Sequence, residues 1–193
     1  MKSKAVLVFC SLLLLTSPSL ASRWYNMTGT VTPSQPNAGD LVRLAVACGW
    51  SDACTPNDVQ VFRNGSVISL NLYCNYPGQV CAQVITSWGT TRGLGYLPEG
   101  TYDVYVTLYG GFPWPDQGPE YLLTFTVTPC PADINGDGSV DVVDLLYFVD
   151  AFGSVAGDPN YDAACDFNSD GSVDVGDLLI LIDYWGIRIP PPI

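Results

Sequence analysis

The stretch that decides the fold of the C-terminal part of this chain is DINGDGSVDVVD at residues 133–144, because it returns as DFNSDGSVDVGD at residues 166–177. If each copy is extended to the glycine nine residues beyond its end, 13 of 21 aligned residues are identical. Each copy has oxygen-bearing side chains at positions 1, 3, 5, 9 and 12 and a glycine at position 6. The repetition indicates two copies of one small unit, each directing several oxygen atoms toward a common centre.

This spacing is typical of an EF-hand-type calcium loop. Calcium prefers six to eight oxygen ligands at roughly 2.3–2.6 Å, and alternate residues supply them only where the chain bends sharply. Gly138 and Gly171 allow that bend. Position 12 is Asp instead of the usual Glu, so the helix that follows must lie closer to the ion. We therefore predict two bound Ca²⁺ ions. The expected ligands are Asp133, Asn135, Asp137, Ser139, Asp141 and Asp144 in the first loop, and Asp166, Asn168, Asp170, Ser172, Asp174 and Asp177 in the second.

An apolar run follows each loop, at residues 145–152 and 178–185, and each run ends at a glycine. These runs predict two short helices. Asp141 and Asp174 are placed as N-caps, with an aspartate three residues later in a capping-box arrangement. The segments before the loops are poor helix formers, so each unit is half of an EF-hand.

Two such loop-helix units in tandem, over residues 130–186, resemble a type I dockerin. The resemblance implies a module that binds two calcium ions and docks onto a cohesin domain, often to join carbohydrate-active enzymes to a scaffold. Members of that family commonly carry a Ser-Thr pair at loop positions 10 and 11, whereas this chain has valines or glycine there. The expected partner-binding residues are Val142, Val143, Leu146, Val175, Gly176 and Leu179.

Three alternatives to the docking interpretation stay open at this point. In the first alternative, the valines at positions 10 and 11 pack between the two helices instead of facing a partner. In the second, calcium stabilises the module but the module has no cohesin partner. In the third, the acidic repeats form a solvated tail, although apolar residues follow both loops in register.

Residues 1–21 have the features of a secretory signal peptide, with two lysines, an apolar run and Ser-Leu-Ala before the expected cleavage point. No later segment is long and apolar enough for a membrane span. We therefore expect a secreted or cell-surface protein. Without this leader, five arginines face nineteen acidic residues, which makes nucleic acid and anionic membranes poor partners.

Six cysteines remain outside the leader, and an even number in an exported chain indicates disulfides. We expect a bridge between Cys130 and Cys165, which stand close before the two loops. The other four cysteines allow three pairings, of which Cys54 with Cys81 and Cys48 with Cys74 is weakly preferred. Zinc is a poor alternative, because the chain has no histidine and no Cys-x-x-Cys motif.

Residues 22–129 alternate apolar and polar side chains between turn signals, which predicts strands. The expected strands are residues 27–31, 42–48, 59–61, 68–72, 80–84, 102–108 and 121–127, with a hairpin turn at Asn64-Gly65. Seven strands in a segment of this length are typical of an immunoglobulin-like β-sandwich. Tyr102 resembles the tyrosine corner of such folds. The expected organisation is a mainly β protein with a small α part: a sandwich (22–129), a dockerin-like module (130–188) and a proline-rich tail (189–193).

The absence of histidine excludes Ser-His-Asp triads and imidazole bases. A glycoside hydrolase would need a pair of catalytic carboxylates. No sequence motif in the sandwich segment identifies such a pair, so we expect a non-catalytic protein. Five tryptophans, among them Trp50, Trp88 and Trp114, make a polysaccharide a second candidate partner; the simpler interpretation is that they cover the edges of the core.

Overall fold

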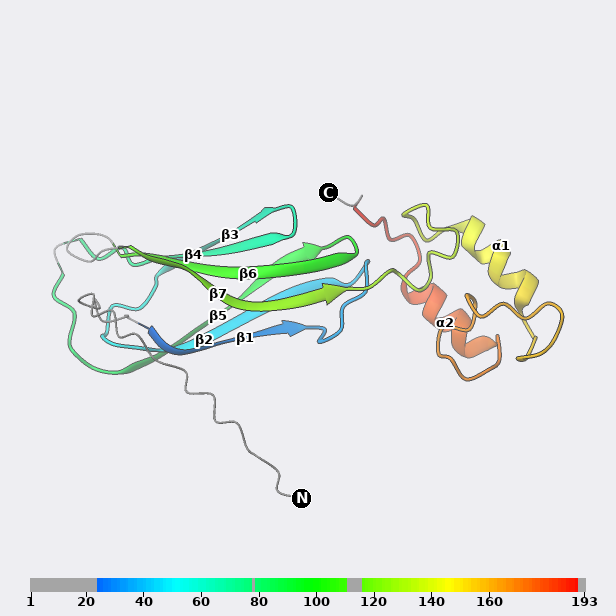
Figure 1. Cartoon of the computed structure of the whole chain (residues 1–193), viewed down its shortest axis with the longest axis horizontal. Coiled ribbons are helices and arrows are strands. Elements are labelled where there is room, and N and C mark those ends of the chain that lie inside the picture. Colours follow the sequence, from blue (N-terminus) through cyan, green and yellow to red (C-terminus); the bar gives the residue numbers. More distant parts are fainter. Residues whose placement is uncertain (1–23, 78, 111–115, 191–193) are drawn as a thin grey trace, which may run out of the picture.

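The computed structural model describes residues 24–77, 79–110 and 116–190 (Figure 1). The predicted leader and the loop that carries Trp114 lie outside these residues. No described helix is long and apolar enough to cross a membrane. The elements, in order, are β1 (Trp24–Thr32), β2 (Leu41–Trp50), β3 (Asp58–Asn64), β4 (Val67–Tyr73), β5 (Thr86–Tyr96), β6 (Gly100–Tyr109), β7 (Gln117–Val127), α1 (Val142–Ala151) and α2 (Val175–Asp183).

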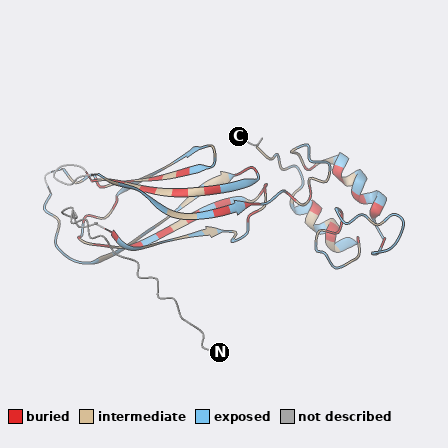
Figure 2. Cartoon of the chain, in the orientation of Figure 1, coloured by how far each residue is buried: buried red, intermediate tan, exposed pale blue. Residues whose placement is uncertain are grey.

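The strands form two sheets, ordered β1-β2-β5 and β3-β4-β6-β7, that lie against each other as an immunoglobulin-like β-sandwich (Figure 1). Alternate residues of the central strands face inward, as the period of two predicts. In β2 the buried positions are Val42, Leu44 and Val46, and β4 and β6 alternate in the same way. Figure 2 shows buried residues in red alternating with less buried ones along strands of both sheets. The two helices lie beyond the end of the sandwich at which β7 ends.

One strand pairing departs from the antiparallel sheets of immunoglobulin domains. The expected hairpin joins β3 to β4 across Gly65, but β4 then pairs with β6 in parallel. The apolar content of β3 and β4 explains which of the two lies inside the sheet. Leu70 and Leu72 of β4 are fully buried, whereas Val59 and Val61 of β3 are only half-buried. The more apolar strand therefore occupies the interior of the sheet and β3 becomes its edge.

The strand predicted at residues 80–84 is wrong. Described residues of this segment form a loop, and Val80 and Val84 are exposed. The fifth strand is β5, whose sequence TSWGTTRGLGY has no regular apolar alternation. Because β5 lies at the edge of the three-stranded sheet, none of its residues is fully buried, and the pattern that reveals a central strand is missing.

The tyrosine corner is present, because the hydroxyl of Tyr102 donates to the backbone carbonyl of Pro98 at 2.8 Å. Three tryptophans lie in a row at the core. The ring centroids of Trp24 and Trp50 are 6.1 Å apart, and those of Trp50 and Trp88 are 6.2 Å apart. Trp24 and Trp50 are buried. These two rings therefore pack in the core and offer no face to a sugar.

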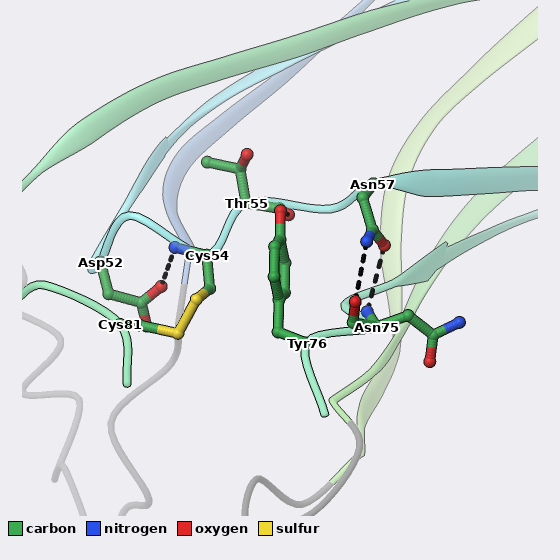
Figure 3. Close-up of a disulfide and its surroundings, with 7 residues drawn as sticks. All are labelled: Asp52, Cys54, Thr55, Asn57, Asn75, Tyr76 and Cys81. Carbon is green, nitrogen blue, oxygen red and sulfur yellow. Dashed lines mark hydrogen bonds between the residues drawn. A yellow bond between two sulfur atoms is a disulfide. The ribbon is translucent and has the colours of Figure 1, made fainter. Parts of the chain in front are cut away.

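The preferred pair Cys54 and Cys81 forms a disulfide (Figure 3). It ties the segment after β2 to the loop before β5. The hydroxyl of Tyr76 reinforces this connection by donating to the carbonyl of Thr55 at 2.8 Å. Asp52 accepts the backbone N–H of Cys54 at 2.8 Å beside the bridge. The bonded sulfur atoms are not metal ligands, so this grouping of one carboxylate and two cysteines is structural.

The other two expected bridges are not formed. Cys48, Cys130 and Cys165 have free thiols and are buried. Cys48 therefore does not pair with Cys74. Cys130 packs in the large core that includes the sandwich, whereas Cys165 packs in a separate small core, so the two cysteines lie at different ends of the C-terminal module. Burial raises the pKa of the Cys48 thiol to about 11, which makes it a poor nucleophile.

Candidate calcium and docking site

Both acidic repeats form the bent loops that the sequence predicts. Gly138 and Gly171, at position 6, have φ values of +86° and +89°, a region that L-amino acids with side chains rarely adopt. Position 4 also requires positive φ. It is filled by Gly136 in the first loop and by Ser169, at φ +59°, in the second. The second loop therefore carries one strained residue that the first does not.

The side chains at positions 1 and 3 fold inward and accept backbone N–H groups of their own loop. In the first loop, Asp133 accepts from Asp137 at 3.1 Å and from Gly138 at 2.9 Å. Asn135 Oδ1 accepts from Asp137 at 2.9 Å. The second loop repeats each bond with the equivalent residues, at 3.1, 3.0 and 2.9 Å. Each loop therefore closes around its own first and third side chains. Among the described residues, no three carboxylates of either loop bring their oxygens within 4.8 Å of one another.

The position-12 aspartates connect each loop to its helix. Asp144 is fully buried, and its two oxygens accept the N–H groups of Ile134 at 2.8 Å and Asp141 at 2.9 Å. In the second loop, Asp177 accepts the N–H groups of Asn168 at 3.1 Å and Asp174 at 3.0 Å, and both helices show the predicted capping box. A buried carboxylate of this kind holds the start of the helix close to the loop. This agrees with the expectation for Asp, whose side chain is shorter than that of the Glu usual at position 12.

The donor set suits a hard divalent cation. Each loop offers four aspartates, one asparagine amide and a serine backbone carbonyl, with no sulfur or nitrogen ligand. Transition metals prefer imidazole or thiolate, whereas calcium takes all-oxygen sites of this size. Ser139 and Ser172 stand at position 7 and are half-buried, where the backbone carbonyl is the expected ligand.

Tyr161 is a functional residue that sequence reasoning missed. Its hydroxyl donates to Asp166, the first predicted ligand of the second loop, at 2.7 Å. This hydrogen bond, helped by backbone N–H groups of the loop, holds the pKa of Asp166 below its usual value. The equivalent residue before the first loop is Thr128, which belongs to the sandwich, so the repeat gave no signal for this contact.

Each loop is closed by the segment that follows the helix of the other repeat. After α2, the N–H groups of Gly186 and Ile189 donate to Val140 and Gly138 of the first loop, and Val140 donates back to Ile187. We call residues 186–189 the C-terminal strap. The expected tail therefore begins after Ile189, because that residue is bonded to the first loop.

The second loop shows the same pattern with the segment that follows α1. Gly153 and Ala156 donate to Val173 and Gly171, and Val173 donates back to Ser154. We call residues 153–156 the middle strap. The six bonds are related by the 33-residue repeat, so the module has pseudo-twofold symmetry and neither half is closed without the other.

The helices present apolar side chains to solvent at equivalent positions. Val142, Leu146 and Val149 are separated by four and three residues, which places them on one face of α1. The equivalent residues of α2 continue the pattern. These side chains, with one aromatic residue beyond each helix, are between 46% and 61% exposed. We call this set the helix stripe; its members are Val142, Leu146, Val149, Phe152, Val175, Leu179, Ile182 and Trp185.

The structure also places the remaining residues that were expected to contact a partner. Val143 is exposed, and Gly176 at the equivalent position of α2 is half-buried. The inward faces of the helices carry Phe148 and Leu181 instead. The valines at positions 10 and 11 therefore do not pack between the helices.

Residues 131–185 match the family model described as the dockerin type I domain. These residues form a type I dockerin domain. No curated protein matches the chain. Type I dockerin domains bind calcium, which supports the predicted identity of the ion.

Two matching solved structures are mutants of a type II cohesin–X-dockerin complex from Acetivibrio cellulolyticus. The C-terminal interface mutant is 19% identical, with 58% of this chain and 68% of that chain covered and a TM-score of 0.30. The N-terminal interface mutant is 21% identical, with 56% and 69% covered and a TM-score of 0.28. Similarity at these TM-scores is too low to support an inference about this chain.

Proposed function

We propose that this protein is an exported, non-catalytic docking protein whose dockerin domain binds two calcium ions and attaches to a cohesin-type domain. The observation that carries the proposal is the helix stripe. Soluble domains seldom expose this many large apolar side chains in register, and such patches mark sites of protein contact. The dockerin assignment supports a cohesin as the partner.

The charges of the dockerin domain support the occupancy of both loops. Its segment carries twelve acidic residues and one arginine, Arg188. Four aspartates crowd each loop, and like charges at such separations repel one another. Two calcium ions offset four of these negative charges and relieve that repulsion where it is strongest.

A non-catalytic role is supported by the contacts of the sandwich carboxylates. Glu120 accepts the indole N–H of Trp24 at 2.9 Å, and Asp103 accepts the hydroxyl of Thr124. Asp116 accepts the backbone N–H of Gly110 at 3.1 Å. These contacts belong to the structure of the sandwich. The chain has no histidine to act with them.

The two helices offer the partner two similar surfaces. Valine in place of the hydroxyl residues common in the family shifts recognition toward apolar contact, and each fully buried valine or leucine contributes about 1.5–3 kcal/mol. The partner surface should therefore be apolar. Because the stripe is repeated by the pseudo-twofold symmetry, the partner can approach either helix in an equivalent orientation.

Binding to a panel of purified cohesin domains, with calcium and with EDTA, tests this proposal. We expect calcium-dependent capture of at least one cohesin. Leu146→Asp or Leu179→Asp alone should weaken binding, because the other helix remains, and the double variant should abolish it. Ile85→Asp is the matched control, since this residue is also a large apolar side chain, is even more exposed, and lies in the sandwich.

Two outcomes would contradict the docking role. One is calcium binding without capture of any cohesin, which would favour a purely structural calcium module. The other is unchanged capture by the double helix variant, which would place the contact elsewhere. Polysaccharide turnover that is abolished by one Asp or Glu substitution in the sandwich would contradict the non-catalytic assignment.

A further inference from the structure

The two calcium loops have similar sequences but different surroundings. Val140 and Val173 both occupy position 8 and both are fully buried. Val140 packs in the large core that contains the sandwich residues, whereas Val173 packs in the small core of the dockerin domain. Ala132 and Cys165, each one residue before a loop, are divided in the same way. The end of the module that carries the first loop therefore packs against the sandwich. The end that carries the second loop does not belong to the sandwich core.

Tyr184 breaks the symmetry at the contacting end, because the equivalent residue after the other loop is Ala151. Ala151 packs in the small core, whereas the ring of Tyr184 packs against the large core. The Tyr184 hydroxyl donates to Asp40 at 3.2 Å and accepts from the amide of Asn37 at 3.2 Å. Both partners lie between β1 and β2, so Tyr184 fastens the end of α2 to the sandwich. Burial is the main cause that raises the pKa of Tyr184.

The C-terminal strap continues this connection from Tyr184 to the first loop. A Cβ added at Gly39 of the sandwich would lie 3.2 Å from the Ile187 side chain, so the backbone of the sandwich directly contacts the strap. Ile189 packs against the large core and donates its N–H to Gly138. In the middle strap, by contrast, Val155 is half exposed, and no described residue of that strap belongs to the large core.

The first loop also faces the sandwich across a cleft of about 510 Å³. Ala38, Pro98 and Glu99 line it from the sandwich, and Asp133 and Asp137 line it from the loop. Two predicted ligands of the first ion therefore lie beside the sandwich surface.

We propose that the sandwich, acting through Tyr184 and the C-terminal strap, holds the first calcium loop in its binding shape, so that the first site binds calcium more tightly than the second. This inference rests on the proposed occupancy of both loops. A loop that is ordered before binding loses less conformational entropy when the ion arrives. The second loop does not pack against the sandwich core, and it carries the strained Ser169. More of the binding free energy of its ion is therefore used to order the loop. Tyr184 is thus a positioning residue for an ion that it does not contact.

The test uses calorimetric titration of the full chain with calcium chloride, in variants that keep one site each. Asp166→Ala leaves the first site, and Asp133→Ala leaves the second. In the first background, Tyr184→Ala should weaken calcium binding about tenfold, equivalent to about 1.4 kcal/mol. In the second background, the same substitution should change binding by less than about twofold, as expected for independent positions. Tyr184→Ala is a matched change, because alanine occupies the equivalent position of the first repeat.

Two further variants separate positioning from general damage. Tyr184→Phe keeps the ring and should cause a smaller loss at the first site. Asn37→Ala alters only the sandwich side and should also weaken the first site alone, so it decides the question if Tyr184→Ala does not fold. Circular dichroism at saturating calcium checks folding.

Equal weakening of both sites, or weakening of neither, overturns the inference while calcium binding stands. If the unsubstituted chain binds no calcium, the proposed function itself fails.

Discussion

Removal of calcium with EDTA should unfold the dockerin domain and leave the sandwich folded. The two parts depend on the ion to different degrees because their cores differ in size. The sandwich buries apolar residues from two sheets in one large core. Among the residues that the structure describes, the small core of the dockerin domain has five buried members: Phe148, Ala151, Cys165, Val173 and Leu181.

The expected loss of stability follows from binding linkage. At a free calcium concentration about 1,000 times the Kd, each ion adds about 4.1 kcal/mol, so two ions add about 8 kcal/mol. Whole domains are stable by only about 5–15 kcal/mol, and the smallest lie near the lower limit. Helices as short as α1 and α2 do not persist alone. The dockerin domain should therefore have no stable folded state without the ion.

Differential scanning calorimetry of the full chain provides the assay. In calcium chloride we expect two transitions, one for each part. In EDTA the dockerin transition should disappear. The melting temperature of the sandwich should fall by no more than about 5 °C, since a loss of about 1 kcal/mol in the free energy of unfolding lowers the melting temperature of a domain of this size by about that amount. This small shift reflects the loss of the dockerin residues Val140, Tyr184 and Ile189 from the large core.

A variant that combines Asp133→Ala with Asp166→Ala is the control, and it should melt like the EDTA form in both buffers. Identical melting curves of the unsubstituted chain with and without calcium would refute the reasoning. Loss of both transitions in EDTA would show instead that the sandwich depends on the ion.

Four further predictions concern single contacts. Tyr102→Phe removes the tyrosine-corner hydrogen bond and should lower the stability of the sandwich by about 1 kcal/mol in urea unfolding, without a change in calcium binding. Replacement of both Cys54 and Cys81 by Ser opens a bridge with a sequence separation of 27 and should cost about 3.5 kcal/mol in the same assay. Tyr161→Phe removes a bond to a ligand of the second loop and should weaken that site alone about tenfold in calorimetric titration. Ser169→Gly relieves a left-handed backbone strain and should stabilise the dockerin domain by about 1 kcal/mol in thermal melts.

The sequence was sufficient wherever the structure depends on neighbouring residues. The glycines at position 6, the capping boxes and the two helices were all predicted, because each is decided within a dozen residues. The Tyr102 corner and the β3–β4 hairpin were predicted for the same reason. The hydrogen bonds that the side chains at positions 1 and 3 accept within each loop follow from the same local spacing.

Pairing between distant segments was not predictable from local patterns. Val80 and Val84 satisfy the alternation rule but are exposed, while β5 forms from a sequence rich in threonine and glycine. The parallel pairing of β4 with β6 and the free thiols of Cys130 and Cys165 depend on which segments meet in space.

The sequence by itself determined that two acidic loops with helices exist, because the spacing of their oxygen-bearing side chains and glycines is a local property of the chain. Only the tertiary structure decided that the loops are not equivalent. Val140 and Val173 are the same residue in the same motif, yet one packs in the large core with the sandwich and the other in the small core. The physical reason is that a pseudo-twofold module can place only one of its two ends against a single neighbour. Tyr184 in place of alanine makes that end fit the sandwich.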